Sequence, residues 1–201
     1  MAGQQNGRLE PSDEELVEAF KNGSVDAFNR LVSRYKDPLM NFSSRYLGDR
    51  DEADDVVQET FVRVYRKIHT YKPVARFSTW IYTIATNLVK SHYRRRKRHP
   101  ALSISQSVGG ENQSEYEIPD NRYRPDAEAA RSVRQSIIEN ALASLSHKYR
   151  EIVILCDIED LSYEEICSIT GLNIGTVKSR LNRGRSQLQV LLKDILKDED
   201  E

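Results

Sequence analysis

Cysteine is scarce in this chain of 201 residues, because the sequence contains only Cys156 and Cys167. Two thiols cannot build a disulfide framework, and their spacing does not match a zinc site. We interpret both as small apolar residues of a helical core. The four histidines are scattered and no histidine or cysteine stands at ligand spacing, so the sequence predicts no metal site and no cofactor.

Long hydrophobic runs are also missing. No apolar stretch approaches the roughly 20 residues that a membrane-spanning helix needs. The first ten residues are polar and lack the apolar region of a secretory signal. These absences predict a cytoplasmic protein without a membrane span. No stretch alternates between apolar and polar residues as a strand would, so we expect an all-α fold.

Net charge is nearly absent, at -1, but the charges are sharply segregated along the chain. Residues 61–98 contain eleven Lys or Arg and no Asp or Glu, whereas residues 51–59 contain five acids and no base. Faces of opposite sign suit a protein partner on one side and a polyanion on the other.

Apolar residues at three- and four-residue spacing predict two small helical domains joined by a flexible linker, the second containing a helix-turn-helix. The linker shows no apolar period and is too long for a compact connection, so it separates domains. The expected parts are a disordered N-terminus (1–11), a first domain (12–98), the linker (99–125), a second domain (126–195) and an acidic tail (196–201).

Start and stop signals mark several helices. Ser12 or Asp13 can cap the first helix, and the segment 162–165 (SYEE) reads as a capping box. Gly171 is expected to end the helix that this box begins, and Asn173 to cap the next one. Pro38 is expected to kink or break the long helix in which it lies.

The helix-turn-helix is the clearest motif of the second domain. A short helix (162–170), a tight turn (171–173) and a longer helix (174–192) follow one another, and the longer helix has no acid before Asp194. The N-terminal half of such a second helix enters the major groove of DNA. Gly175 is small enough for the helix start to approach a phosphate. The residues that we expect to contact DNA are Thr176, Lys178, Ser179, Arg180 and Arg183.

Aromatic residues are interleaved with the basic residues of segment 61–98. Rings beside cations suit single-stranded nucleic acid, because bases stack on the rings and phosphates pair with Lys and Arg. Tyr71 lies in an expected loop, which favours a role in stacking. Trp80 fits a core position equally well, since it also lies on the apolar stripe of its helix.

The acidic segment that begins at Asp51 leaves two interpretations open. A charge run of this kind is usually a solvated helix face. Its polar side, which continues to Arg66 beside an apolar stripe, could equally dock a helix of another protein.

Three segments together resemble the extracytoplasmic-function (group IV) sigma factors of bacterial RNA polymerase, within the sigma-70 family. Residues 51–65 (DEADDVVQETFVRVY) resemble the helix with which that family binds the polymerase clamp. Residues 77–88 (FSTWIYTIATNL), followed by 93–96 (YRRR), resemble its promoter-melting helix. Residues 161–166 (LSYEEI) and 175–181 (GTVKSRL) resemble its helix-turn-helix for the upstream element. The resemblance covers roughly residues 12–195.

The resemblance implies a mechanism without catalysis. Core RNA polymerase would be bound through Asp54, Asp55, Gln58 and Glu59. The single non-template strand at the minus-ten element would be taken, with flipped bases, by Tyr71, Arg76, Phe77, Trp80, Asn87, Lys90 and Arg94. The duplex minus-thirty-five element would be read by the helix-turn-helix residues named above. The linker would thread toward the polymerase channels, and an anti-sigma factor is an expected partner.

Other functions fit the sequence less well. A two-domain regulator of duplex DNA that acts without polymerase would leave the acidic segment 51–59 without a role. A nuclease could place a metal between Asp51, Asp54, Asp55 and Glu59, which share a helix face, but no base, nucleophile or phosphate loop accompanies them. A pure protein-interaction module would not explain the acid-free basic segment.

Overall fold

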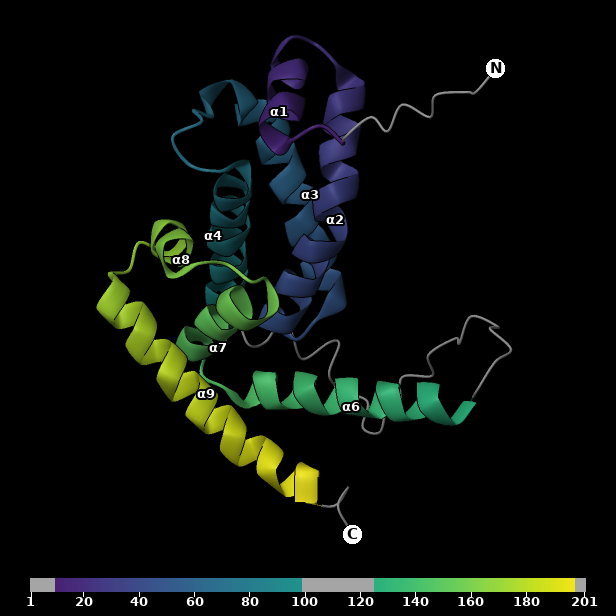
Figure 1. Cartoon of the computed structure of the whole chain (residues 1–201), viewed down its shortest axis with the longest axis vertical. Coiled ribbons are helices and arrows are strands. Elements are labelled where there is room, and N and C mark those ends of the chain that lie inside the picture. The colour runs from purple at the N-terminus through teal and green to yellow at the C-terminus, as the bar shows by residue number, and fades with distance from the viewer. Residues whose placement is uncertain (1–9, 99–124, 198–201) are drawn as a thin grey trace, which may run out of the picture.

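The computed structural model describes residues 10–98 and 125–197. Every regular element within these residues is helical, which confirms the all-α prediction. The first four helices are α1 (Asp13–Lys21), α2 (Val25–Leu47), α3 (Arg50–Lys67) and α4 (Phe77–Arg98), with the short 3₁₀ turn η1 (Ile68–Thr70) after α3. Helices α2, α3 and α4 pack side by side, and α1 lies across their upper end (Figure 1).

The second set of helices begins at Pro125 with α6 and lies against the lower half of the first set (Figure 1). These elements are α6 (Pro125–Ser144), α7 (His147–Val153), the π-helical turn η2 (Ile154–Ile158), α8 (Tyr163–Thr170) and α9 (Ile174–Lys197). The predicted linker therefore lies outside the described residues except for Pro125. The same holds for most of the predicted N-terminal segment and for most of the acidic tail.

The predicted caps are confirmed by hydrogen bonds. Ser12 and Ser162 each form a complete capping box, the latter with Glu165. Gly171 ends α8 in the left-handed conformation, with φ of 72°, which glycine adopts without steric cost. The Asn173 side chain accepts a hydrogen bond of 2.8 Å from the backbone N–H of Thr176 at the start of α9.

The break considered at Pro38 does not occur, because α2 continues through this residue. A proline inside a helix removes one backbone hydrogen bond and typically costs about 3 kcal/mol. Helix α2 compensates by burying one apolar stripe on both sides of the proline. Leu31 and Tyr35 precede Pro38 on this stripe, and Leu39 and Phe42 follow it, all at most 8% exposed.

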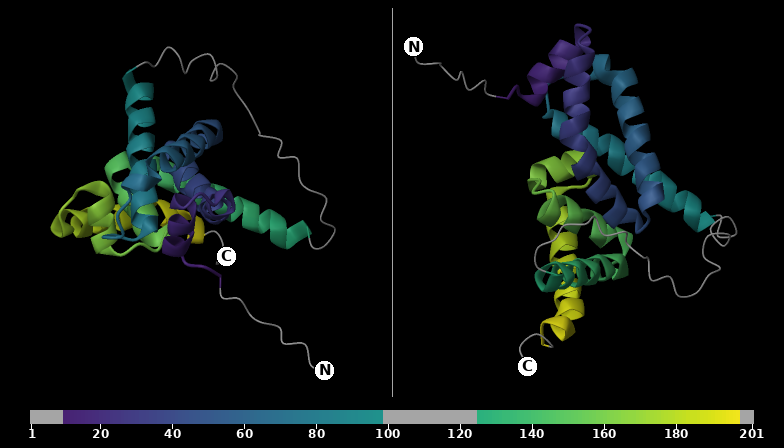
Figure 2. Two further views of the ribbon diagram at one scale, coloured as in Figure 1. Left: turned by 90° about the horizontal axis from the view of Figure 1, so that it is seen from above. Right: turned by 90° about the vertical axis from the view of Figure 1, so that its right-hand side faces the viewer.

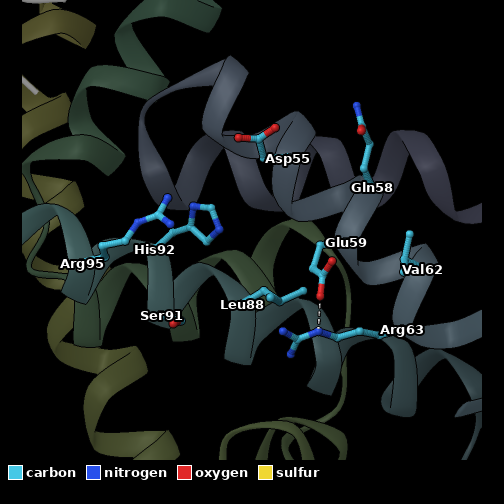
Figure 3. Close-up of a pocket in the computed structure, with 9 residues that line it drawn as sticks. All are labelled: Asp55, Gln58, Glu59, Val62, Arg63, Leu88, Ser91, His92 and Arg95. Carbon is cyan, nitrogen blue, oxygen red and sulfur yellow. Dashed lines mark hydrogen bonds and ion pairs between the residues drawn. The ribbon is translucent and has the colours of Figure 1, made fainter. Parts of the chain in front are cut away.

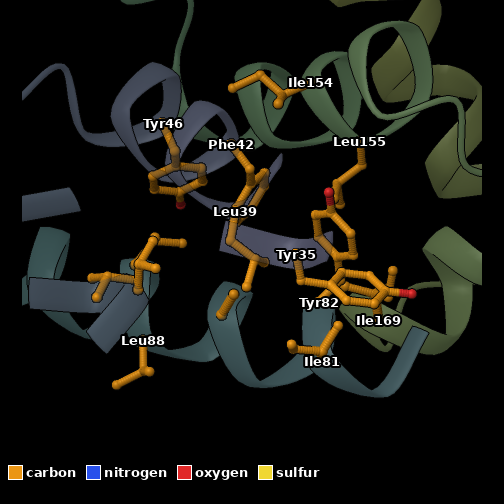
Figure 4. Packing of buried hydrophobic residues seen from close by; sticks show 14 of the residues in the cluster. Tyr35, Leu39, Phe42, Tyr46, Ile81, Tyr82, Leu88, Ile154, Leu155 and Ile169 are labelled. Atoms are coloured by element: carbon orange, nitrogen blue, oxygen red, sulfur yellow. The ribbon is translucent and has the colours of Figure 1, made fainter. Parts of the chain in front are cut away.

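One apolar cluster runs through both sets of helices. Figure 4 shows Phe42, Ile81 and Tyr82 of the first domain close to Leu155 and Ile169 of the second. All five side chains are at most 4% exposed. The two further views of the ribbon show the same close packing, with α8 and η2 against α4 and the end of α2 (Figure 2).

Candidate nucleic-acid interface

A groove of about 510 Å³ lies between α3 and α4, and all of its lining residues belong to these two helices (Figure 3). Three of the four residues expected to bind polymerase line it: Asp55, Gln58 and Glu59. Asp54 lies one turn before Gln58 and accepts a hydrogen bond from its side chain. The structure thus gathers the four expected residues on one face of α3.

The opposite wall of this groove, on α4, carries the cation of Arg95. Helix α4 contributes Leu88, Ser91, His92 and Arg95, while Arg63 of α3 donates a hydrogen bond of 2.7 Å to Glu59 (Figure 3). The groove is therefore mixed in charge. Such a surface suits a polar protein partner better than a nucleic acid backbone, which would be repelled by the acids.

Two aromatic residues expected to stack on bases lie instead in the core. Tyr71 is 4% exposed and Phe77 is completely buried. The Tyr71 hydroxyl donates a hydrogen bond of 2.8 Å to the carbonyl oxygen of Ala75 and so closes the loop on itself. The loop position of Tyr71 indicated a ring available for stacking. The ring instead turns inward and contacts Phe77 and Trp80 at centroid distances of 5.8 and 5.4 Å.

Trp80 remains half-buried and lies over this pair of rings. Burial raises the pKa of the Tyr71 hydroxyl above its ordinary value, which keeps it a donor. Of the loop residues, Val74 is 92% exposed, although it is not among the residues expected to contact DNA. An apolar residue next to Pro73 at a loop tip was the available signal.

The basic and polar residues expected at the minus-ten strand follow one side of α4. Asn87 and Arg94 are exposed, and Lys90 is partly covered. Lys90 forms an ion pair of 2.6 Å with Glu151 of α7. Arg76, just before α4, lies 3.7 Å from Glu165 of α8. Neither acidic partner was anticipated, since 61 residues or more separate each pair in the sequence and no periodicity links them.

The helix-turn-helix presents its expected DNA-contacting side chains outward. Val177 and Leu181 are buried beneath α9, which fixes the rotation of the helix. Lys178, Ser179 and Arg183 are exposed, while Thr176 and Arg180 are partly exposed. The Lys178 ammonium lies 5.7 Å from the centre of the Tyr163 ring of α8. The structure thus brings all five expected residues to the first half of α9.

Helices α7 and α9 approach closely at Gly184. A Cβ atom built there would lie 2.6 Å from a methyl carbon of Val153. Arg185, next along α9, donates a hydrogen bond of 3.1 Å to Asp157 and is thereby held against η2. Both contacts support the position of α9, and neither was foreseen from the sequence.

Within residues 10–98 and 125–197, no group of three His, Cys, Asp or Glu side chains could hold a metal ion. The acids of α3 considered for a nuclease site do not converge on a common point there. Among the described helices, none is both long enough and apolar enough to cross a membrane.

Both halves of the chain match models of known protein families. The family model for Sigma-70 region 2 matches residues 31–99, and that for Sigma-70, region 4 matches residues 135–188. The ECF RNA polymerase sigma factor SigW of Bacillus subtilis is 35% identical over 181 residues, which are 89% of this chain and 96% of SigW. SigE of Mycolicibacterium smegmatis is 36% identical over 90% of this chain and 69% of its own length.

Solved structures agree with these matches. The sigma factor RpoE of Bartonella quintana, in complex with the anti-sigma factor NepR, is 30% identical with a TM-score of 0.62, over 84% of this chain and 98% of RpoE. CnrH in complex with the cytosolic domain of CnrY is 24% identical, and its TM-score of 0.67 supports the fold. The chain belongs to the sigma-70 family. Within that family it is a member of the extracytoplasmic-function sigma factors, a group of transcription regulators.

Proposed function

We propose that this sigma factor binds core RNA polymerase through the acidic wall of the groove between α3 and α4. As a member of its family the chain directs promoter-specific transcription initiation. The exposure of Asp55 and Gln58 supports the assignment of the contact to α3. Asp54 and Glu59 would act with them, since both are already hydrogen-bonded on the same face. We further propose that the protein acts in the cytoplasm, beside polymerase and DNA, and has no catalytic activity.

The minus-ten strand would be contacted by Arg76, Trp80, Asn87, Lys90 and Arg94. Cations along one helix face can track a single-stranded backbone, and a partly exposed ring can stack on an extruded base. Tyr71 and Phe77 would serve a different role from the one expected. Their buried rings would hold Trp80 in position, because both contact it at centroid distances below 6 Å.

The minus-thirty-five duplex would be read by the start of α9. Lys178, Ser179 and Arg183 are exposed there, and Thr176 and Arg180 stand beside them. The backbone N–H groups of the first turn are directed toward an approaching phosphate, as at other helix N-termini. This arrangement is that of a helix-turn-helix which reads the major groove.

An anti-sigma factor is the expected regulatory partner. The support is the complex of RpoE with NepR, whose sigma factor is 30% identical to this chain. The family match gives no support to the alternative of a duplex-DNA regulator that acts without polymerase. The observation that carries the proposal is that sigma regions 2 and 4 both match, in that order, with the groove beside Asp55 and Glu59 on the first and the helix-turn-helix on the second.

In vitro transcription tests the proposal directly. Core RNA polymerase, with and without this protein, is supplied with a fragmented library of genomic DNA, and the new transcripts are mapped. We expect start sites that share two upstream motifs and depend on the added protein. A matched reaction with Arg183→Ala, Lys178→Ala protein should keep polymerase binding and lose most of these starts. No new start sites, together with no co-purification with core polymerase, would reject the proposed function.

A further inference from the structure

The loop between η1 and α4 is exposed at its tip and buried at both ends. Residues 72–76 are all exposed, whereas Tyr71 before them is 4% exposed and Phe77 after them is completely buried. The Tyr71 hydroxyl closes the loop through its hydrogen bond to the carbonyl oxygen of Ala75. Pro73 fixes one further backbone angle within the tip. The position of the exposed tip therefore depends on how its two buried ends are held.

Helix α1 lies beside this loop and contacts both of its ends (Figure 1). The Lys21 ammonium donates a hydrogen bond of 3.0 Å to the carbonyl oxygen of Tyr71 and lies 5.6 Å from the centre of the Tyr71 ring. The Glu14 carboxylate accepts a hydrogen bond of 3.4 Å from the backbone N–H of Phe77, the first residue of α4. An acid at this end of α4 also interacts favourably with the helix dipole. Two side chains of one helix thus hold the residues on either side of the tip.

The spacing of these two side chains along α1 matches the two ends of the loop. Glu14 and Lys21 are seven residues apart, which places them on one face of the helix, two turns from each other. The rise of an α-helix separates them by roughly 10 Å. Because the helix between them is regular, this separation is fixed, and both ends of the loop are held at a set distance.

Helix α1 is itself fixed to α2. Asp13, at the start of α1, accepts hydrogen bonds from the side chains of Arg34 and Tyr35. Arg34 also donates a hydrogen bond of 3.0 Å to the carbonyl oxygen of Pro11. The Tyr35 ring contacts the Phe77 ring at a centroid distance of 5.5 Å. The position of α1 is thus set by α2, and α1 transmits it to the loop.

The ends of the loop also determine where Trp80 lies. The rings of Tyr71 and Phe77 contact Trp80 at centroid distances of 5.4 and 5.9 Å. A binding site distinguishes similar ligands only when its groups are held within about 0.5 Å of the productive geometry. Release of either end of the loop should therefore reduce the preference for one base over another, while phosphate contacts elsewhere on α4 keep most of the affinity.

We propose that Glu14 and Lys21 are positioning residues, which set the base selectivity of the minus-ten surface by holding the two ends of the loop between η1 and α4. This inference rests on the proposed function of α4 and of Trp80. Helix α1 fixes the loop, and the loop tip together with Trp80 meets the displaced strand. The cations of α4 supply affinity for any sequence, and the held loop supplies the preference.

The test removes each contact of α1 in the full chain. Lys21→Met deletes the donor and keeps most of the apolar stem, Glu14→Ala deletes the acceptor, and the double variant combines them. The matched controls are Lys36→Met, an exposed cation of α2, and Asp26→Ala, an exposed acid in the first turn of α2. Lys21→Arg is the conservative variant, because a guanidinium can donate to the same carbonyl oxygen.

Trp80 is the only tryptophan of the chain, so its fluorescence reports the state of the loop directly. Acrylamide quenching of Trp80 should increase in Lys21→Met and in Glu14→Ala, and most in the double variant. It should stay at the native value in Lys21→Arg, Lys36→Met and Asp26→Ala. Thermal unfolding followed by circular dichroism shows that each variant is folded at the temperature of the experiment.

Selectivity is measured with the holoenzyme, formed from each variant and core polymerase. The probes are fluorescein-labelled single strands of about 12 nucleotides, with the mapped minus-ten motif or with one base of that motif changed, and binding is followed by anisotropy. The ratio of the two affinities should fall about fivefold in the double variant and less in each single variant, since one lost hydrogen bond typically lowers an equilibrium constant about three- to tenfold. Lys21→Arg should keep the native ratio, and the affinity of every variant for core polymerase should stay native.

Trp80→Ala separates the two ways to fail. If Trp80→Ala reduces selectivity but the double variant of α1 keeps the native ratio, the positioning role is refuted and the proposed function stands. If the double variant loses polymerase affinity in the same proportion as strand affinity, with the ratio unchanged, Glu14 and Lys21 only stabilise the fold and the positioning role is again refuted. If Trp80→Ala leaves both strand affinities at their native values, the proposed function of this surface is itself rejected.

Discussion

At the scale of single residues, Arg150 places a guanidinium that is 9% exposed among backbone carbonyl oxygens. It donates to Leu145 at 3.0 Å and to Tyr46 at 2.7 Å, and also to Ala143. Burial lowers the pKa of Arg150, but a guanidinium stays protonated at any pH of interest. No local pattern around Arg150 indicates this role, since an arginine within an apolar helix is usually interpreted as a residue that faces solvent.

Arg150→Met should therefore lower the free energy of unfolding by about 2–4 kcal/mol. Methionine fills the space but leaves buried carbonyl oxygens without a donor, at a cost of about 1–3 kcal/mol each. Urea unfolding followed by circular dichroism measures the change. The exposed Lys67→Met in α3 is the control and should stay within about 0.5 kcal/mol of the native protein. Equal midpoints for the two variants would show that Arg150 is not structural.

Glu159 should make the stability of the packed protein depend on pH. Burial raises the pKa of its carboxyl above the ordinary 4.5, while the hydrogen bond from Tyr82 and the charge of Arg45 act in the opposite direction. The packed state then binds the proton more tightly than the unfolded state does. The contribution of this group is fully present below pH 4.5 and is lost as the pH rises through the raised value.

Thermal unfolding of the native protein and of Glu159→Gln, from pH 7 toward pH 4, checks this prediction. Glutamine cannot ionise and can still accept from the Tyr82 hydroxyl. We expect the native protein to gain stability relative to Glu159→Gln as the pH falls. A constant difference across the range would mean that Glu159 titrates equally in the folded and unfolded states.

At the scale of elements, two glycines of α9 have opposite roles. A Cβ at Gly184 would lie 2.6 Å from Val153, whereas one at Gly175 would meet only Asn173 at 3.5 Å. Gly184→Ala should destabilise the protein by about 1–3 kcal/mol, because it forces α7 and α9 apart. Gly175→Ala should instead stabilise the helix by up to about 1 kcal/mol, since alanine favours helix more than glycine does. The melting temperatures of both variants test this prediction. Shifts of the same sign would contradict the close approach of α7 and α9 at Gly184.

The first half of α9 should contribute phosphate contacts. Lys178→Ala is expected to weaken binding to the upstream promoter duplex and to reduce the slope of log K against log salt by about one. Lys193→Ala, an exposed change in the second half of the same helix, is the control and should keep the native slope. The measurement is a fluorescence titration of a mapped promoter at several salt concentrations. An unchanged slope for Lys178→Ala would remove this residue from the interface.

The helix ends could be predicted from the sequence because their causes are local. Ser12, Ser162, Gly171 and Asn173 act within four residues of the backbone groups that they satisfy. Pro38 could not be judged in this way, since the helix around it is held by distant core residues. The burial of Tyr71 could not be predicted for the same reason, because only the later residues Phe77 and Trp80 explain why its ring turns inward.

At the scale of the whole molecule, the order of the two regions was predictable but their packing was not. Three motifs in sequence specified the class of protein, and the structure gathers the expected residues of α3 and α9 on separate faces. The pairs Lys90–Glu151 and Arg76–Glu165 join residues far apart in the chain, so no window of sequence contains both partners. Such contacts follow from the relative placement of domains, which local pattern does not encode.

Polymerase binding should depend on the exposed acid of the groove. Asp55→Lys is expected to lower the affinity for core polymerase by at least about tenfold, because it places a cation where the proposed partner meets an acid. Asp37→Lys, on the exposed side of α2, makes the same charge change outside the groove and should have little effect. Co-purification and a binding titration with core polymerase measure both. Equal affinities for the two variants would move the polymerase contact away from α3.

The contact between Arg150 and Tyr46 uses a backbone carbonyl, whereas Lys90 and Glu151 meet through their side chains. These two kinds of contact should constrain sequence variation among relatives in different ways. Any amino acid at position 46 can offer the carbonyl oxygen, so this position is free to drift as long as its own packing is kept. Positions 90 and 151 are expected to covary among relatives whose two domains pack in the same way. A chimera that combines α4 of one relative with the helix-turn-helix of another should keep its two domains packed together only where both members of the pair are retained.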